Sequence, residues 1–89
     1  MKNDLSSALF GGTKKALLTL LLTHEDETFY LRQITRELKA GSGVVQRELA
    51  LLVGAGILER RPKGRQFFYQ ADRLSPVFKE LRSILVKIK

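Results

Sequence analysis

The side chains of this chain that could do chemistry are suited to recognising another molecule rather than to reacting with it. Gln46 and Arg47 follow a Gly-Ser-Gly sequence at residues 41–43. A glutamine amide can form two hydrogen bonds with adenine, and an arginine guanidinium can do the same with guanine or bind a phosphate. Val44 has the apolar surface that contacts a thymine methyl group. These residue types are able to contact base edges, and a solvated helix face is the alternative.

Groups that catalyse or bind metals are scarce. The chain has no cysteine, which excludes disulfides, thiolate metal sites and cysteine nucleophiles. Its one histidine, His24, stands beside three acidic residues in a polar stretch, and we interpret it as an exposed loop end rather than a metal ligand. The glycines at 11–12 and 41–43 do not follow a convincing strand, as a phosphate-binding glycine loop would. We therefore expect no catalytic residue, no metal and no cofactor, and hence a protein that is not an enzyme.

The charge of the chain is unevenly distributed. The formal net charge is +7. Residues 1–31 have a net charge of −1, and residues 32–89 have a net charge of +8. A localised basic excess favours a polyanionic partner, with nucleic acid as the first candidate. Charge that merely keeps the protein soluble is the alternative.

A helix is predicted to position the candidate base-reading residues. Apolar residues recur at helical spacing over about residues 42–53, which leaves Gln46 and Arg47 on the opposite side. Either Gly41 or Ser42 can cap its start. The Gly-Ala-Gly sequence at 54–56 ends it, with glycine available for a left-handed cap. The residues of the buried stripe are Val45, Leu49, Leu52 and Val53.

A basic hairpin is predicted directly after this helix. Residues 57–61 would pair with residues 66–71 around a turn at residues 62–65. Side chains alternate along a strand, so at most one of Arg60 and Arg61 faces a ligand, and the other can pair with Glu59. For the same reason, some of the three aromatic residues at 67–69 must belong to the core.

The remaining elements complete one domain over residues 1–89. An N-terminal arm (1–12) precedes a core helix over residues 14–23, capped by Thr13. A short strand at 28–30 could join the hairpin, and a helix follows over residues 31–39. Gly41 then allows a tight turn, through a positive φ or a close helix approach. Ser75 and Pro76 start a last helix that continues to residue 89.

Two stretches of the chain carry a resemblance to a known family: FYLRQITREL at 29–38 and GSGVVQRELALLVGAGILERRPKGRQFFYQA at 41–71. Over residues 8–89 the chain resembles winged helix-turn-helix transcriptional regulators of the arsenic-repressor and multiple-antibiotic-resistance-repressor type. It looks closest to the winged-helix domains associated with minimal nucleotidyltransferases. The resemblance implies an α+β, mainly α fold with a three-helix core, a small antiparallel β-hairpin wing, a short third strand and a C-terminal dimerisation helix. The cysteine and histidine clusters of metal-sensing members are missing.

The resemblance also implies sequence-specific binding of double-stranded DNA by a dimeric prokaryotic transcriptional regulator. Family docking places the helix at about 42–53 in the major groove and the wing at 57–71 on the backbone or in the minor groove. Lys14 and Lys15 are further candidates for phosphate contacts. Carried over to this sequence, the DNA-binding residues are Ser42, Gly43, Val44, Gln46, Arg47, Arg32, Arg36, Arg61, Lys63 and Arg65.

The last helix bears a continuous apolar stripe that allows two interpretations. It could close the domain's own core, or it could pack against a second copy, as the resemblance implies. A docking module for a separately encoded nucleotidyltransferase is the alternative function. The longest apolar stretch, residues 16–22, is shorter than the ~20 residues that span a bilayer, and we expect a cytoplasmic protein. The residues of the expected dimer interface are Val77, Phe78, Leu81, Ile84, Leu85 and Ile88.

Overall fold

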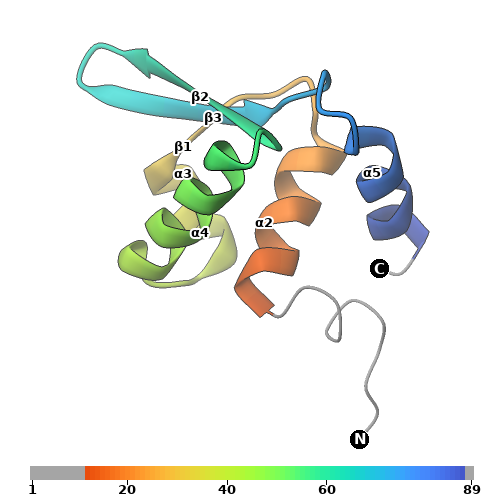
Figure 1. Cartoon of the computed structure of the whole chain (residues 1–89). Helices are drawn as coiled ribbons and strands as arrows, with labels where there is room; N and C mark the ends of the chain where they lie inside the picture. The colour runs from red at the N-terminus through yellow and green to blue at the C-terminus, as the bar shows by residue number, and fades with distance from the viewer. Residues whose placement is uncertain (1–11, 88–89) are drawn as a thin grey trace, which may run out of the picture.

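The computed structural model describes residues 12–87, so most of the expected arm at 1–12 lies outside the described residues, as does Ile88. In Figure 1 α2 stands in the centre, with α3 and α4 on one side and α5 on the other. The hairpin formed by β2 and β3 crosses above the helices and extends beyond α3 and α4. The elements are α2 (Gly12–Thr23), β1 (Phe29–Tyr30), α3 (Leu31–Leu38), α4 (Ser42–Gly54), β2 (Leu58–Lys63), β3 (Gln66–Ala71) and α5 (Phe78–Lys87).

The hydrophobic core is arranged around α2. Leu17 and Leu21 of this helix are fully buried, as the helical spacing predicted, and Leu18 and Leu22 are buried beside them. Every other described helix and strand adds at least one side chain to the same cluster. The domain is therefore held together mainly by burial of these apolar groups around one helix. The other buried members are Phe29, Ile34, Val45, Leu49, Leu52, Leu58, Tyr69, Ala71, Phe78 and Leu85.

The helix ends differ from the sequence predictions in two places. α2 already includes Gly12, so Thr13 lies inside the helix and not at its N-cap. α5 begins at Phe78 rather than at Pro76, because Ser75 and Pro76 form a turn in which the backbone N–H of Phe78 donates to the carbonyl of Ser75 over 3.1 Å. Both errors concern helix boundaries, which residue preferences alone place poorly.

The turn between α3 and α4 uses a residue that was not expected. Lys39 adopts the left-handed conformation, with φ 53° and ψ 41°, and its backbone N–H donates to the carbonyl of Thr35. Gly41 is extended, with φ −66°, and a Cβ added at this position would meet no atom of another part of the chain within 4 Å. The prediction that Gly41 supplies a positive φ or a close helix approach was therefore wrong. Gly41 is instead the N-cap residue of α4.

The end of α4 follows the predicted glycine cap. Gly56 has a φ of 78°, and its N–H donates to the carbonyl of Val53. The N–H of Ile57 donates to the carbonyl of Leu52, and each of the two hydrogen bonds is 3.0 Å long. These two bonds form a Schellman motif, which ends the helix and directs the chain into β2.

The sheet has the strand order β1-β3-β2, and the short third strand predicted at 28–30 is present as β1. β2 and β3 pair from Leu58 with Ala71 out to Lys63 with Gln66, so only Gly64 and Arg65 form the turn. The predicted four-residue turn at 62–65 was therefore too long. Pro62 lies inside β2, which an edge strand tolerates because one of its sides needs no backbone donor. No described helix is long and apolar enough to cross a membrane.

Candidate nucleic-acid interface

The first two turns of α4 carry a group of solvent-exposed residues. The buried side of the helix consists of Val45, Leu49 and Leu52, as the sequence predicted. The five exposed residues at the start of the helix are those proposed to contact bases, namely Ser42, Gly43, Val44, Gln46 and Arg47. Gly41, the N-cap, has no side chain to occupy the free backbone N–H groups of the first turn. Those groups are therefore available to an anion.

Gln46 does not point freely into solvent. Its side-chain nitrogen donates a hydrogen bond to the Ser42 hydroxyl over 3.0 Å. The two residues are four positions apart and so share one side of the helix. The sequence placed both residues in the site but did not indicate that they contact each other.

The two sides of the hairpin differ in character. We call the side that carries the buried Leu58, Tyr69 and Ala71 the helix side, and the opposite one the outer side. Residues directly opposite in an antiparallel pair lie on the same side of the sheet. Arg60 pairs with Tyr69 and therefore lies on the helix side. Arg61, the next residue, lies on the outer side.

The structure places these two arginines in different surroundings. Arg61 donates two hydrogen bonds to one carboxylate oxygen of Glu59, at 3.0 and 2.7 Å, so its charge is compensated on the outer side. The guanidinium of Arg60 lies 4.6 Å from the centre of the Phe67 ring on the helix side. The assignment of Arg61 to the interface stays a prediction, and Arg60, which pairs with no described carboxylate, is a second candidate on the helix side. The sequence showed the alternation but not which register the strand would adopt.

Two aromatic residues cover the outer side near β1. The rings of Tyr30 and Phe68 lie 4.3 Å apart, and the Lys63 ammonium lies 5.3 Å from the centre of the Phe68 ring. Phe68 is thus enclosed between two neighbours, which leaves its ring faces poorly placed to stack on a base. Lys63 is exposed near the tip of the hairpin, where it was predicted to lie.

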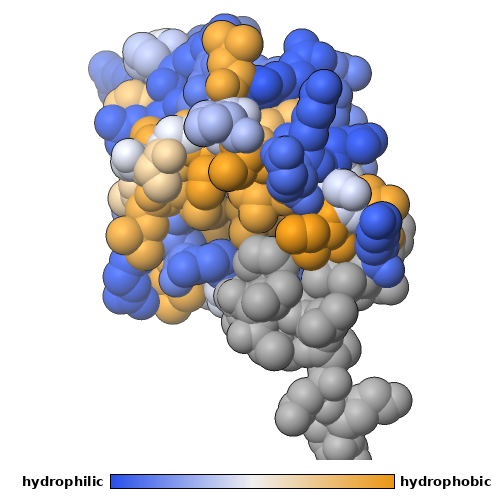
Figure 2. All heavy atoms as spheres, turned by 45° about the vertical axis from the view of Figure 1, so that its right-hand side comes forward, coloured by the Kyte–Doolittle hydropathy of each residue, from blue (hydrophilic) through white to orange (hydrophobic). Residues whose placement is uncertain are grey.

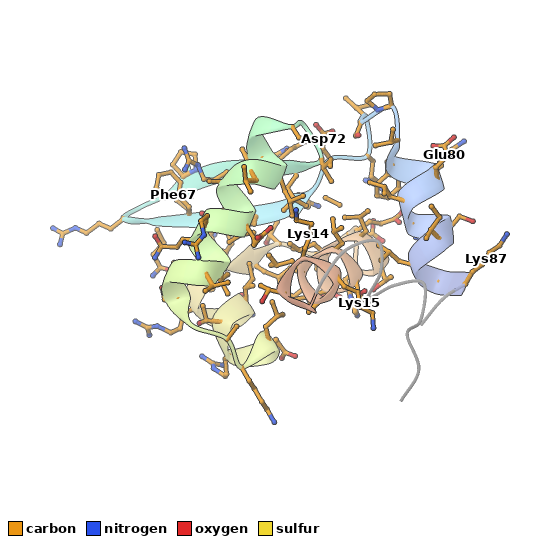
Figure 3. The ribbon with its side chains drawn as sticks, turned by 60° about the horizontal axis from the view of Figure 1, so that its bottom comes forward. Lys14, Lys15, Phe67, Asp72, Glu80 and Lys87 are labelled. Atoms are coloured by element: carbon orange, nitrogen blue, oxygen red, sulfur yellow. The ribbon has the colours of Figure 1, made fainter. Side chains whose placement is uncertain are left out.

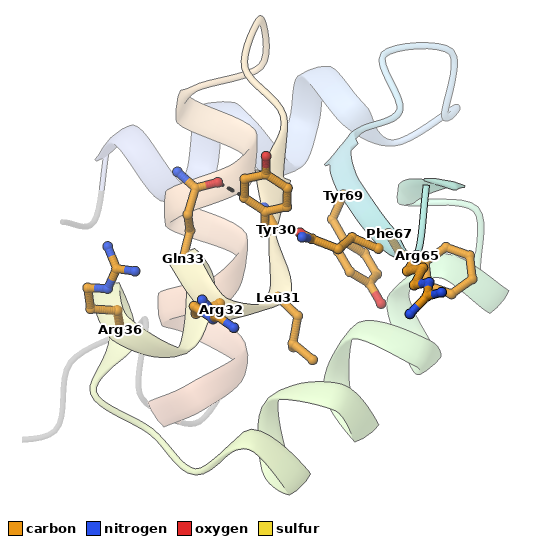
Figure 4. A pocket seen from close by; sticks show the side chains of 9 residues that line it. Tyr30, Leu31, Arg32, Gln33, Arg36, Arg65, Phe67 and Tyr69 are labelled. Atoms are coloured by element: carbon orange, nitrogen blue, oxygen red, sulfur yellow. Dashed lines mark hydrogen bonds between the residues drawn. The ribbon is translucent and has the colours of Figure 1, made fainter. Parts of the chain in front are cut away.

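A groove runs between the start of α3 and the hairpin, with a volume of about 670 Å³ (Figure 4). Its charged lining residues are all arginines: Arg32 and Arg36 come from α3 and Arg65 from the hairpin turn. All three were predicted to be DNA contacts, and the structure brings them to one place. We call this feature the arginine groove. Its other lining residues are Tyr30, Leu31, Gln33, Gln66, Phe67 and Tyr69.

Some of the described basic side chains pair with a carboxylate, which compensates their charge, and others do not. Within residues 12–87 the ion pairs are Lys14 with Glu48, Arg61 with Glu59, Arg73 with Glu25 and Asp26, and Arg82 with Glu25. Lys14 and Lys15, both labelled in Figure 3, belong to the first turn of α2, and Figure 1 shows that end of the helix pointing away from the hairpin. No described carboxylate pairs with the cations of the arginine groove or of the α4 start. Uncompensated cations between α3 and the hairpin turn are Arg32, Arg36, Lys39, Arg47, Arg60, Lys63 and Arg65.

The expected dimer interface divides into buried and exposed residues. Phe78 and Leu85 are 8% and 1% exposed because α5 packs them against the domain's own core, so assigning them to a dimer interface was wrong. Leu81 is partly buried against the same core. Val77 and Ile84 remain 44% and 36% exposed. Figure 2, with the α5 side turned forward, shows hydrophobic residues gathered across the middle of this surface.

Comparison with known proteins identifies the fold. No protein-family model and no curated protein matches the chain. A solved structure of human N-acetylserotonin methyltransferase in complex with SAM is similar over 80% of this chain, with 20% identity and a TM-score of 0.61, but this chain spans only 20% of the length of that enzyme. Reduced HlyU from Vibrio cholerae N16961 is similar over 92% of this chain and 76% of its own, with 16% identity and a TM-score of 0.62.

These similarities confirm the predicted α+β winged helix-turn-helix fold, since HlyU is a winged-helix protein. α3, the turn at Lys39 and α4 form the helix-turn-helix, and β2 with β3 forms the wing. The narrower assignment to the arsenic-repressor or multiple-antibiotic-resistance type stays a prediction.

Proposed function

We propose that this chain binds double-stranded DNA in a sequence-specific way and acts as a transcriptional regulator. The start of α4 enters the major groove, where Gln46 and Arg47 contact base edges. The wing and α3 contact the backbone on either side. HlyU, whose fold is similar, is a winged-helix transcriptional regulator, which agrees with this proposal.

One observation carries the proposal. The exposed first turns of α4 lie in the same half of the molecule as the uncompensated arginines, while the acidic side chains of Glu25, Glu48 and Glu59 pair with other cations. A fold alone would not imply this, because winged helices can serve other purposes. A positive surface beside exposed residues that can bind bases is the arrangement expected of a DNA reader.

We propose further that the chain acts as a homodimer through one side of α5. Val77 and Ile84 are seven positions apart and so lie on the same side of the helix. The Leu81 N–H donates to the Val77 carbonyl over 2.9 Å, which places Val77 in the helical hydrogen-bond pattern. A two-fold dimer would present two α4 helices to half-sites about 34 Å apart on a palindrome.

The alternative is a protein-docking module, for instance one that recruits a separately encoded nucleotidyltransferase. The similarity to a fifth of a much longer methyltransferase chain favours it, because it shows this fold within an enzyme. In this alternative, the exposed apolar residues of α5 contact the other protein and DNA is not bound.

Selection from a library of random duplexes separates the two functions. The purified chain is incubated with the library at moderate salt, and bound duplexes are amplified and sequenced over several rounds. The proposed function predicts enrichment of a palindromic motif. The docking module predicts no enriched motif, and that result would overturn the proposed function.

A further inference from the structure

The arginine groove lies at the N-terminus of α3. Four of its lining residues are the N-cap and the first three residues of that helix, namely Tyr30, Leu31, Arg32 and Gln33. The N-cap residue forms no side-chain cap hydrogen bond, so the N–H groups of Leu31 and Arg32 have no partner from it. Such N–H groups and the positive end of the helix dipole attract an anion. The start of α3 therefore adds to the positive charge of the arginines around it.

A buried hydroxyl in the same groove also lacks a partner. Tyr69 lines the groove and is only 7% exposed. None of the hydrogen bonds within residues 12–87 involves its hydroxyl. Figure 4 shows this hydroxyl directed between Leu31 and Arg65. Buried hydroxyl groups are normally hydrogen-bonded, so a ligand that enters the groove can supply the acceptor that Tyr69 lacks.

The burial of Tyr69 distinguishes this ligand from a DNA backbone. The phosphates of a duplex can reach Arg32, Arg36 and Arg65, because all three side chains are exposed. A side chain that is 7% exposed is accessible only to a molecule small enough to enter between α3 and the hairpin. The volume of the groove is about 670 Å³, which lies within the range of about 300–1,000 Å³ found for small-molecule sites.

The lining defines the chemistry of that small molecule. Its charged groups are three guanidiniums, with no acidic residue among them. A phosphate monoester, with a charge of about −2, balances them better than a carboxylate with a single charge. Its oxygens also provide enough acceptors for guanidinium, helix N–H and hydroxyl donors together. Leu31 and the 44% exposed Phe67 add apolar surface for the organic part of the ester.

We propose that the arginine groove is a regulatory site for a small phosphate monoester with an apolar organic part. The phosphate binds Arg32, Arg65 and the Tyr69 hydroxyl at the start of α3, and the organic part packs against Phe67. The bound ester occupies arginines that are proposed to contact DNA and therefore lowers the affinity for DNA. This regulatory role rests on the proposed function, whereas the binding site itself does not.

Direct binding is measured without DNA. Amide NMR spectra of the isotope-labelled chain are recorded during titration with phenyl phosphate, and with sodium sulfate at matched ionic strength. We expect saturable shifts of the Leu31 and Arg32 amides with phenyl phosphate and not with sulfate.

Variants assign this binding to the groove. Tyr69→Phe removes only the hydroxyl and should raise the Kd of phenyl phosphate about tenfold or more, the usual effect of losing a hydrogen bond to a charged group. Arg65→Gln, an exposed substitution in the hairpin turn, should raise it similarly without touching the core. Arg61→Gln is the matched control, because it removes a charge on the outer side of the hairpin, and it should leave this Kd unchanged.

Two further probes define the organic part of the ester. Glycerol phosphate has the same charge but a polar body, so it should bind at least about threefold more weakly than phenyl phosphate. Equal Kd values for the two would overturn the assignment of an apolar part. AMP distinguishes the source of the ester: tighter binding than phenyl phosphate identifies a nucleotide, and weaker binding identifies a non-nucleotide ester.

Competition with DNA tests the regulatory role. A fluorescently labelled duplex is bound to the wild type, and its anisotropy is followed while phenyl phosphate is added at constant ionic strength. The ester should release the duplex at concentrations near its own Kd, and Tyr69→Phe should require about tenfold more ester. Retention of the duplex by chain that is saturated with the ester would overturn the regulatory role.

The outcomes separate this inference from the proposed function. Duplex binding without saturable binding of phenyl phosphate overturns the ester site and leaves the proposed function standing, as do equal Kd values for wild type, Tyr69→Phe and Arg65→Gln. Saturable binding of the ester without duplex binding supports the site and overturns both the proposed function and the regulatory role. Circular dichroism of each variant confirms that the fold is intact.

Discussion

The side-chain amide of Gln46 donates a hydrogen bond to the hydroxyl of Ser42, one turn earlier on α4, over 3.0 Å. An amide nitrogen carries two hydrogens, and the carbonyl oxygen of the same side chain accepts independently. One N–H and the carbonyl oxygen of Gln46 therefore remain available for an adenine edge. Ser42 then orients the side chain that we propose contacts a base, instead of competing with that base.

This relationship predicts that Ser42 and Gln46 act as a unit. On the selected duplex, Ser42→Ala should weaken binding by about 0.5–1.5 kcal/mol, the usual net value of one hydrogen bond, because the amide is no longer oriented. It should relax the preference at the same base pair as Gln46→Ala. Anisotropy titrations of the two single variants and the double variant measure the coupling, and strictly additive losses would show that Ser42 acts alone.

The left-handed residue between α3 and α4 predicts a stabilising substitution. A residue with a side chain incurs an energetic penalty at φ 53°, which glycine avoids. Lys39→Gly should therefore raise the free energy of unfolding by about 0.5–1 kcal/mol, after allowance for the greater freedom of glycine in the unfolded chain. Urea denaturation followed by circular dichroism measures the change.

Gly41→Ala is the matched control for this substitution. The extended backbone of Gly41 suits alanine, and the added methyl group meets no atom of another part of the chain within 4 Å. Its free energy of unfolding should stay within about 0.5 kcal/mol of wild type. A stabilisation confined to Gly41→Ala, with none for Lys39→Gly, would contradict the assignment of the left-handed position.

The buried sides of α2 and α4 were predictable, because apolar residues at helical spacing fall together on one side of a helix. The Lys39 turn was not, because a nearby glycine was the obvious candidate for a positive φ. The sequence also did not decide which of Arg60 and Arg61 would face the helices, because a shift of one residue in strand register exchanges the two sides of a hairpin. Shortening the turn from four residues to two shifts the pairing by two residues and leaves each arginine on its side, so the burial of Leu58 and Tyr69 against the helices decided which side Arg60 occupies.

The apolar stripe of α5 shows a second limit of sequence analysis. Periodicity predicted that its residues share one side of a helix, but not whether α2 or a second copy covers them. The structure packs Phe78 and Leu85 into the domain core and leaves Val77 and Ile84 exposed. The width of the stripe therefore reflects two adjoining surfaces, of which only the exposed one remains available to a partner.

That division predicts different outcomes for adjacent residues. Leu85→Ala should lower the free energy of unfolding by about 2–5 kcal/mol, because it opens a cavity in the core. Ile84→Glu should cost about 1 kcal/mol or less in the monomer, because the side chain is already partly exposed. If α5 forms the proposed dimer, Ile84→Glu should also weaken self-association.

Sedimentation equilibrium over a range of protein concentrations measures this self-association. Val86→Glu is the matched control, because Val86 is 47% exposed but lies on the opposite side of α5 from Ile84. Equal dissociation constants for the two glutamate variants would argue against the proposed interface.

The central claim is that the start of α4 discriminates between DNA sequences. The most direct measurement is the ratio of Kd for a scrambled duplex to Kd for the selected duplex, at one fixed salt concentration, in wild type and in Arg47→Ala. If Arg47 contacts a base, its loss should cost about 1–3 kcal/mol on the selected duplex and much less on the scrambled one, so the ratio should fall. A ratio near one in wild type, or one that Arg47→Ala leaves unchanged, would contradict the claim.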